Sequence, residues 1–125
     1  MSFLCPECSN TKSLQIIRSI ELAPDARSDE ITLQVVRCRD CDYEGLAVYE
    51  ESTRGALDSE TVDHYGYDVD RESLRSIHVT IKRCPKPKDA WCKCKSHEKL
   101  NQRDPIGRWV RPGYAPNQKI YPIIL

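Results

Sequence analysis

The sequence has little of what a membrane protein or a typical enzyme requires. Its 125 residues include one Phe, one Met and five Gly, and the formal net charge is zero. This composition argues against a large aromatic core, so we expect a thin aliphatic one. No apolar run approaches the roughly 18 residues of a membrane-spanning helix. Neither a phosphate-binding glycine loop nor a complete acid–base constellation is visible, and we therefore predict neither enzyme activity nor membrane association.

The first residues, MSFLCPEC, lack the basic and apolar regions of a secretory signal, which favours a cytoplasmic location. The chain contains seven cysteines. Cysteines in a reducing compartment rarely form disulfides, and an odd number cannot all pair within one chain. Metal ligation by thiolates is the better explanation for them.

The charges are unevenly distributed along the chain. Residues 84–125 carry 9 basic and 3 acidic side chains, a net charge of +6, whereas residues 1–55 carry −4 and residues 56–83 carry −2. A basic segment is the natural place for an anionic partner to bind. An equally good alternative is that this segment is simply solvated, or that it contacts the acidic first half of its own chain.

Three segments have the composition of short strands. Residues 13–22 and 31–38 alternate apolar and polar side chains, and the turn-rich residues 23–30 between them predict a hairpin. Residues 43–49 read as a third strand that closes a small antiparallel sheet and ends near residues 52–55. One CxxC turn precedes this hairpin and a second follows it, so the sequence brings four sulfurs to one point. Four thiolates suit tetrahedral zinc, and the predicted ligands are Cys5, Cys8, Cys38 and Cys41.

This arrangement resembles the zinc ribbon family. The sequence Arg27-Ser28-Asp29-Glu30 is followed by ITLQVVR and then CRDC, which is similar to the ribbons of transcription elongation factors that stimulate transcript cleavage by RNA polymerase. The resemblance implies that Asp29 and Glu30 reach the polymerase active site and help to position a metal ion and a water molecule. The alternative is that these two acids belong to an ordinary solvated turn.

An amphipathic helix is predicted in the middle of the chain. Apolar positions and one histidine recur at spacings of three and four: Leu74, Ile77, His78 and Ile81. Asp70 offers an N-cap, and residues 58–60 offer an earlier helix start. A proline follows Cys84. We expect His78 to lie along the buried stripe. The acids of residues 62–70 are better explained as loop residues and helix caps than as a cation or nuclease site.

The remaining cysteines predict a second zinc site of the Cys3His type, with Cys84, Cys92, Cys94 and His97 as ligands. Their spacing is unusual, because the CKC sequence can offer two sulfurs to one metal only if the chain turns sharply. The alternatives are reduced structural thiols with Trp91 in the core, or a redox-sensitive CxC pair.

The last segment interleaves basic and aromatic side chains with Gly and Pro, a composition that can stack on exposed bases and neutralise phosphates. The candidate nucleic-acid contacts are Lys86, Lys88, Lys93, Lys95, Arg108, Trp109, Arg111 and Tyr114. Trp109 and residues 120–125 could equally complete a core that is otherwise small. For residues 120–125 we favour packing, or docking on another chain as an added strand.

Taken together, the sequence predicts an α+β fold in three parts. These are a zinc ribbon with a three-stranded antiparallel sheet at residues 1–55, a helical segment at 56–84, and a basic Cys/His-rich extension with an apolar tail at 85–125. We expect a non-enzymatic zinc protein that binds nucleic acid or a nucleoprotein complex. Two alternatives stay open: a protein-interaction adaptor or small subunit of a larger complex, and a transcript-cleavage accessory of RNA polymerase.

Overall fold

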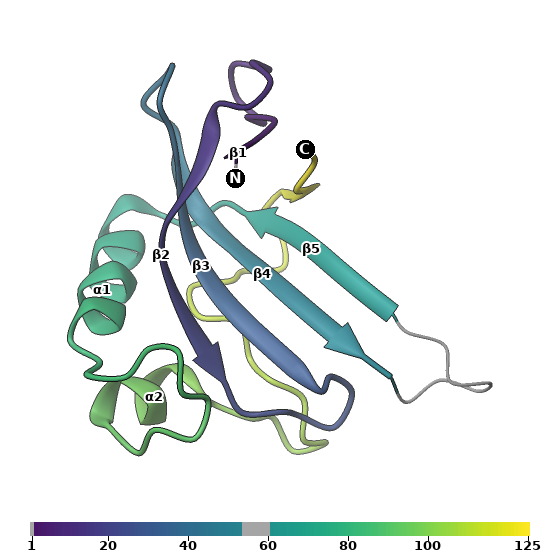
Figure 1. Cartoon of the computed structure of the whole chain (residues 1–125), viewed down its shortest axis with the longest axis vertical. Helices are drawn as coiled ribbons and strands as arrows, with labels where there is room; N and C mark the ends of the chain where they lie inside the picture. Colours follow the sequence, from purple (N-terminus) through teal and green to yellow (C-terminus); the bar gives the residue numbers. More distant parts are fainter. Residues whose placement is uncertain (1, 54–60) are drawn as a thin grey trace.

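The computed structural model describes residues 2–53 and 61–125 and has an α+β fold (Figure 1). Its elements in chain order are β1 (Ser2–Phe3), β2 (Leu14–Leu22), β3 (Glu30–Cys38), β4 (Glu44–Ser52), β5 (Thr61–Tyr67), α1 (Arg71–Lys82), α2 (Lys95–Leu100) and β6 (Ile120–Pro122). All the strands form one antiparallel sheet in the order β1-β2-β3-β4-β5-β6. In the part of the chain that the structure describes, no helix is long and apolar enough to cross a membrane.

The predicted hairpin and third strand correspond to β2, β3 and β4, but the prediction of a three-stranded sheet was wrong. The sheet has six strands, because β1, β5 and β6 extend it at both edges. Residues 61–67, which the sequence placed in the helical segment, form β5 instead. This strand pairs with β4 so that Tyr67 lies opposite Leu46 at one end and Thr61 lies opposite Ser52 at the other. The helix start expected at residues 58–60 lies outside the described residues. The sequence did not predict β5, because the polar and aromatic residues of this strand do not alternate clearly with apolar ones.

A β-bulge in β2 separates two cores on opposite faces of the sheet. Pairing with β3 shifts register between Ile16 and Arg18, so one extra residue is inserted. An extra residue moves every later side chain to the other face. Leu14 therefore packs in a small core with Phe3, whereas Ile20, which has the same parity in the sequence, packs in the larger one.

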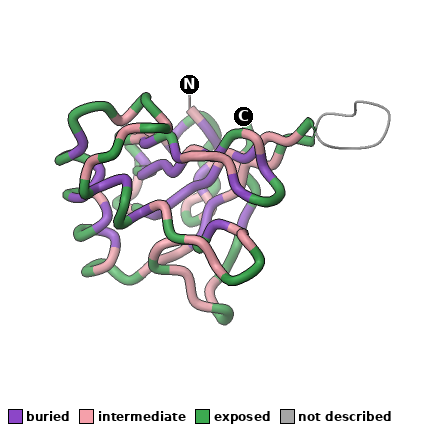
Figure 2. The backbone as a smooth tube through the Cα atoms, turned by 90° about the horizontal axis from the view of Figure 1, so that it is seen from below, coloured by how far each residue is buried: buried purple, intermediate pink, exposed green. Residues whose placement is uncertain are grey.

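The larger core lies between the sheet and the two helices, on the side where Figure 1 shows α1 and α2. Helix α1 begins after the N-cap Asp70 and buries Leu74, Ile77 and Ile81 against the strands. His78 is only half-buried, at the margin of this stripe. Buried residues are concentrated in β3 and β4, and Figure 2 shows exposed residues at many of the outer bends of the chain.

The chain ends close the smaller core. The amide of Leu4 donates to the carbonyl of Ile124 at 2.7 Å, so the two ends of the chain meet at one end of the sheet (Figure 1). Tyr121 of β6 packs over Gly66 of β5, where an added Cβ would lie 2.3 Å from the tyrosine ring. A glycine is therefore required at this position for the tail to pack on the sheet.

Candidate metal centres

The first predicted cysteine set comes together as one cluster, which we call cluster A. Its ligand atoms all lie within 4.8 Å of one another, and its members are Cys5, Cys8, Cys38 and Cys41. The Sγ atoms of Cys5 and Cys41 are 3.7 Å apart, as are those of Cys8 and Cys38. Four sulfurs at 2.3 Å from a tetrahedral zinc ion would be about 3.8 Å apart. The cluster thus has the size of a tetrahedral metal site.

Local backbone geometry aims these sulfurs inward. The amides of Asp40 and Cys41 both donate to the Sγ of Cys38 at 3.4 Å, and the amide of Glu7 donates to that of Cys5. Burial by itself raises the pKa of Cys38, but the Ser13 side chain and these amides outweigh it and lower the pKa to about 6. A thiolate, the form that binds metal, is therefore favoured at Cys38.

The second predicted set also comes together, and we call it cluster B. Its ligand atoms satisfy the same 4.8 Å limit, and its members are Cys84, Cys92, Cys94 and His97. The Nδ1 atom of His97 lies 3.2 Å from the Sγ of Cys84 and 3.3 Å from that of Cys94, and the two sulfurs are 3.4 Å apart. The turn needed to bring the CKC sulfurs together is supplied by the start of α2, for which Cys94 is the N-cap.

The imidazole of His97 is oriented from outside the cluster. Its Nε2 lies 2.8 Å from the carbonyl oxygen of Glu21 in β2. Because a carbonyl can only accept, Nε2 carries the proton, and Nδ1 turns its lone pair toward the sulfurs. A ligating histidine in a metal site is commonly fixed in this way, by a backbone carbonyl on its other nitrogen. The amide of Glu21 also donates to the carbonyl of Pro87 at 2.7 Å, which attaches the cluster B loop to the sheet.

The thiol of Cys94 is prepared for ligation as well. Its Sγ accepts the backbone amide of His97 at 3.3 Å. Burial by itself raises the pKa of Cys94, but the backbone amide of His97 and the neighbouring thiols oppose burial and lower it. Cluster B therefore combines a thiolate-stabilising turn with an imidazole whose metal-binding nitrogen is unprotonated.

The four predicted lysine contacts surround cluster B. Lys86, Lys88, Lys93 and Lys95 are all exposed. Among them stands Trp91, whose side chain is 70% exposed. The alternative prediction, in which Trp91 lies in the core, was therefore wrong. Trp91 was also not among the residues that the sequence predicted to bind nucleic acid. Its position inside the lysine-rich loop was the signal that could have identified it.

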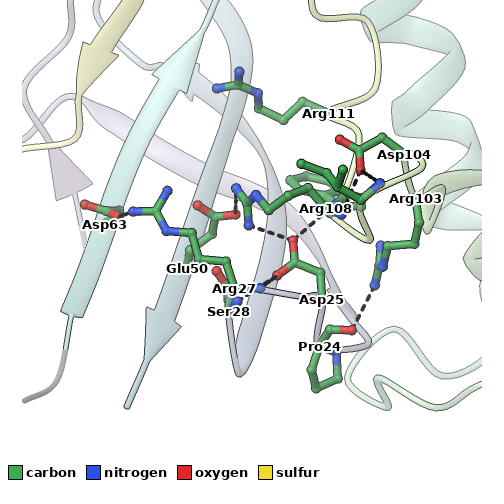
Figure 3. A network of polar contacts seen from close by, with 12 residues as sticks. Pro24, Asp25, Arg27, Ser28, Glu50, Asp63, Arg103, Asp104, Arg108 and Arg111 are labelled. Carbon is green, nitrogen blue, oxygen red and sulfur yellow. Dashed lines mark hydrogen bonds and ion pairs between the residues drawn. The ribbon is translucent and has the colours of Figure 1, made fainter. Parts of the chain in front are cut away.

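Arg108 and Trp109 of the predicted contacts are instead engaged in the fold. The Nη1 of Arg108 lies 2.7 Å from the Oδ2 of Asp25, a carboxylate that is fully buried (Figure 3). Trp109 is 5% exposed, and its indole N–H donates to the carbonyl of Leu100. No base can stack on a ring that is buried in this way. The packing alternative describes Trp109 better than the predicted stacking role.

Arg111 and Tyr114 contact each other. The Arg111 guanidinium carbon lies 3.9 Å from the centroid of the Tyr114 ring, which also packs edge-to-face against Tyr67. Arg111 and Tyr114 are thus already engaged with each other and with Tyr67, whereas Trp91 is exposed.

The hairpin tip does not present two free carboxylates. Asp29 accepts hydrogen bonds from the backbone amide and the hydroxyl of Thr53, at 2.8 and 3.0 Å. Glu30 lies directly across from Glu51 in the sheet, and that neighbouring acid raises the pKa of Glu30. The sequence reasoning saw an acidic pair at this tip, whereas the structure uses one member to join β3 to the end of β4.

The geometry of both clusters is that of sites closed by four protein ligands. The role of Asp29 and Glu30 in transcript cleavage stays a prediction, and so does membership of the zinc ribbon family. Comparison with models of protein families, with curated proteins and with solved structures finds no significant match to this chain.

Proposed function

We propose that clusters A and B each bind one zinc ion, and that both ions are structural. Zinc is borderline-soft and favours four thiolate or imidazole ligands in a tetrahedron. Four protein donors converge in each cluster, so no ligand position is left for a substrate or an activated water. This closed arrangement is the property that separates structural zinc sites from catalytic ones. A colourless purified protein would agree with zinc and disagree with an iron–sulfur centre.

The second part of the proposal concerns the surface around cluster B, residues 82–99, which we call the basic lobe. It carries seven basic and two acidic side chains. All seven basic residues are exposed: Lys82, Arg83, Lys86, Lys88, Lys93, Lys95 and Lys99. We infer that the basic lobe binds single-stranded nucleic acid. The observation that carries this inference is the 70% exposure of Trp91 in the middle of these cations.

A tryptophan is costly to expose to water, so its exposure calls for an explanation. An indole face next to several ammonium groups offers a base a surface to stack on and offers the adjoining phosphates their counterions. The metal in cluster B would hold the loop that carries both, so that little conformational entropy is lost on binding. The bases of duplex nucleic acid are stacked on one another and cannot stack on Trp91. A duplex could therefore contact only the lysines of the basic lobe.

Fluorescence anisotropy with a short labelled single strand tests this proposal. Affinity should fall as salt rises, with a log–log slope of about −3 if four phosphates are contacted. Trp91→Ala should weaken binding about tenfold by removing the stacking surface, with the salt slope unchanged. Replacing Lys86, Lys88, Lys93 and Lys95 by Gln should flatten the slope instead.

The matched control replaces Lys12 and Lys119, exposed lysines outside the basic lobe, by Gln. This double variant should bind like the wild type except for a small uniform effect of net charge. If it weakens binding as much as the lobe variants do, or if Trp91→Ala has no effect, the basic lobe is not the binding surface.

One observation favours the adaptor hypothesis as a second candidate function. Leu125 is 73% exposed and Ile124 is 46% exposed, beside an apolar recess that Phe3 and Ile16 help to line. An exposed apolar patch of this kind can serve as a protein contact. Co-purification of one partner that resists high salt and is lost in Leu125→Asp would support the adaptor reading over nucleic-acid binding.

A further inference from the structure

A pocket of about 430 Å³ lies between strands β4 and β5 and the loop that follows α2, away from both clusters. Its lining contains three arginines, three acids, two aromatic residues and one isoleucine: Arg27, Glu50, Asp63, Tyr65, Asp104, Arg108, Trp109, Arg111 and Ile120. Figure 3 shows the arginines entering from different segments around Glu50. The volume falls within the range of small-molecule sites.

Glu50 is one of the residues that line this pocket, and it has an unsatisfied oxygen. Its side chain is 6% exposed, yet among the described residues its Oε1 has no hydrogen-bond partner. The Nη2 of Arg108 is 3.7 Å away, too far for a hydrogen bond, because Nη1 of the same guanidinium is held by Asp25 at 2.7 Å. Burial raises the pKa of Glu50 although Arg108 partly opposes it. A buried carboxylate oxygen without a donor is costly, and a ligand that brings an N–H group would satisfy it.

A second carboxylate reinforces this preference for a cationic group. Asp63 is the direct cross-strand partner of Glu50, so both side chains project from the same face of the sheet. Like charges placed directly opposite destabilise a strand pair unless a cation lies between them. Arg27 approaches Asp63 at 3.5 Å, but this ion pair is exposed, with side chains that are 60% and 47% accessible. A ligand ammonium between Glu50 and Asp63 would supply a cation at this point.

Arg111 gives the other end of the pocket the opposite preference. Its guanidinium lies over the Tyr114 ring at 3.9 Å, and its Nη1 lies 3.4 Å from the hydroxyl of Tyr65. Within residues 2–53 and 61–125, no carboxylate forms an ion pair with it. The aromatic packing fixes the guanidinium while its charge stays uncompensated. A guanidinium held in this way suits an anion, which it can contact through two N–H groups.

We propose that this pocket binds a small zwitterion of the amino-acid class, with its ammonium group on Glu50 and Asp63 and its carboxylate on Arg111. The unsatisfied Oε1 of Glu50 and the uncompensated guanidinium of Arg111 are separate observations, and each requires one end of such a ligand. This site does not overlap the basic lobe, so it is independent of nucleic-acid binding.

The test is isothermal titration calorimetry of the full zinc-loaded chain with glycine, β-alanine and γ-aminobutyrate, which differ in the separation of their two charges. Ethylamine and propionate, each with one charge, are the comparison ligands. At least one zwitterion should bind with a dissociation constant of about 1 mM or lower, and more tightly than either singly charged compound. Glu50→Gln and Arg111→Gln should each weaken binding at least about tenfold, because each removes one charged contact.

Arg37→Gln is the matched control, since Arg37 forms an exposed ion pair with Glu44 on another part of the sheet. It should leave binding unchanged. Asp63→Asn, at a half-exposed position, gives a second probe of the ammonium end if Glu50→Gln does not fold. The proposal is overturned if no zwitterion binds in this range, if ethylamine or propionate binds as tightly as the zwitterions, or if the pocket variants bind like Arg37→Gln.

Discussion

At the scale of single residues, His97 is defined by what each of its ring nitrogens contacts. Nε2 donates to the carbonyl of Glu21, which leaves Nδ1 facing the cluster with its lone pair, 3.2 Å from the Sγ of Cys84. The same contact connects cluster B to strand β2. A single side chain therefore decides both the chemistry of the cluster and its attachment to the sheet.

Replacement of His97 by Ala should reduce the zinc content from two ions per chain to one. Three thiols without the imidazole leave the tetrahedron incomplete, and loss of a structural ligand weakens zinc binding steeply. Elemental analysis of protein purified without added metal measures this directly. His78→Ala is the control, because His78 is a half-buried histidine of α1 outside both clusters and its removal should leave two ions bound. Two ions retained in His97→Ala would contradict cluster B as a zinc site.

At the scale of elements, one buried carboxylate holds a loop against a hairpin. Asp25, in the turn between β2 and β3, accepts the amides of Arg27, Ser28 and Trp109 and the guanidinium of Arg108. Burial by itself raises the pKa of Asp25, but these donors outweigh it and lower the pKa below its ordinary value. The loop after α2, in which Arg103 and Trp109 form an isolated antiparallel bridge, is thereby attached to the β2–β3 hairpin.

Asp25→Asn should lower the free energy of unfolding by about 3 kcal/mol at neutral pH, because it leaves the Arg108 guanidinium without its buried partner. A carboxyl whose folded-state pKa is lowered stabilises the fold above its unfolded pKa of about 3.9, and this stabilisation is lost only as pH falls through the folded-state value. The difference between variant and wild type should therefore be the same at pH 6 and pH 8. Urea unfolding at both values measures it.

Asp63→Asn is the comparison for this experiment, since Asp63 forms an exposed ion pair with Arg27. Exposed pairs contribute about 0–1 kcal/mol, so this variant should unfold almost like the wild type. Equal losses in the two variants, or a loss in Asp25→Asn that changes between pH 6 and pH 8, would count against the buried attachment.

At the scale of the whole molecule, the larger core is built mainly from the central strands and α1, and Cys84 of cluster B is also one of its members. That core joins all three long central strands to α1, with Ile20, Leu33, Val48 and Ile77 among its members. Cluster A contributes Cys5 and Cys38 to the smaller core, which the contact between Leu4 and Ile124 helps to close. Cluster B organises the basic lobe. Metal binding should therefore order the periphery of a sheet that already has a core.

Chelation of zinc should open two separate segments to trypsin while the central strands stay protected. Cleavage is expected in the basic lobe at Lys88, Lys93 or Lys95, and in the cluster A turns at Lys12 or Arg39, since these loops lose the ion that orders them. In His97→Ala only the basic lobe should become sensitive. Mass spectrometry of the fragments identifies the sites. Early cleavage at Arg18 within β2 would show instead that the whole sheet unfolds without metal.

The sequence was sufficient to identify both sets of cluster residues and the β2–β3 hairpin, because ligand type, CxxC spacing and apolar alternation are local properties. It was insufficient for β5, whose polar residues pair with β4 through contacts that no local pattern specifies. The alternation of the sequence also placed Ile16 and Ile20 on the same face of the strand, whereas the bulge between them puts them on opposite faces.

By itself, then, the sequence determined which donors exist, in what spacing, and that the chain has an α+β fold. Only the tertiary structure decided which basic and aromatic residues remain available for binding. Trp91 is exposed and Trp109 is buried although both lie in the same basic segment. The physical reason is that burial depends on partners distant in the sequence: Arg108 meets Asp25 across 83 residues, and no local pattern encodes that contact.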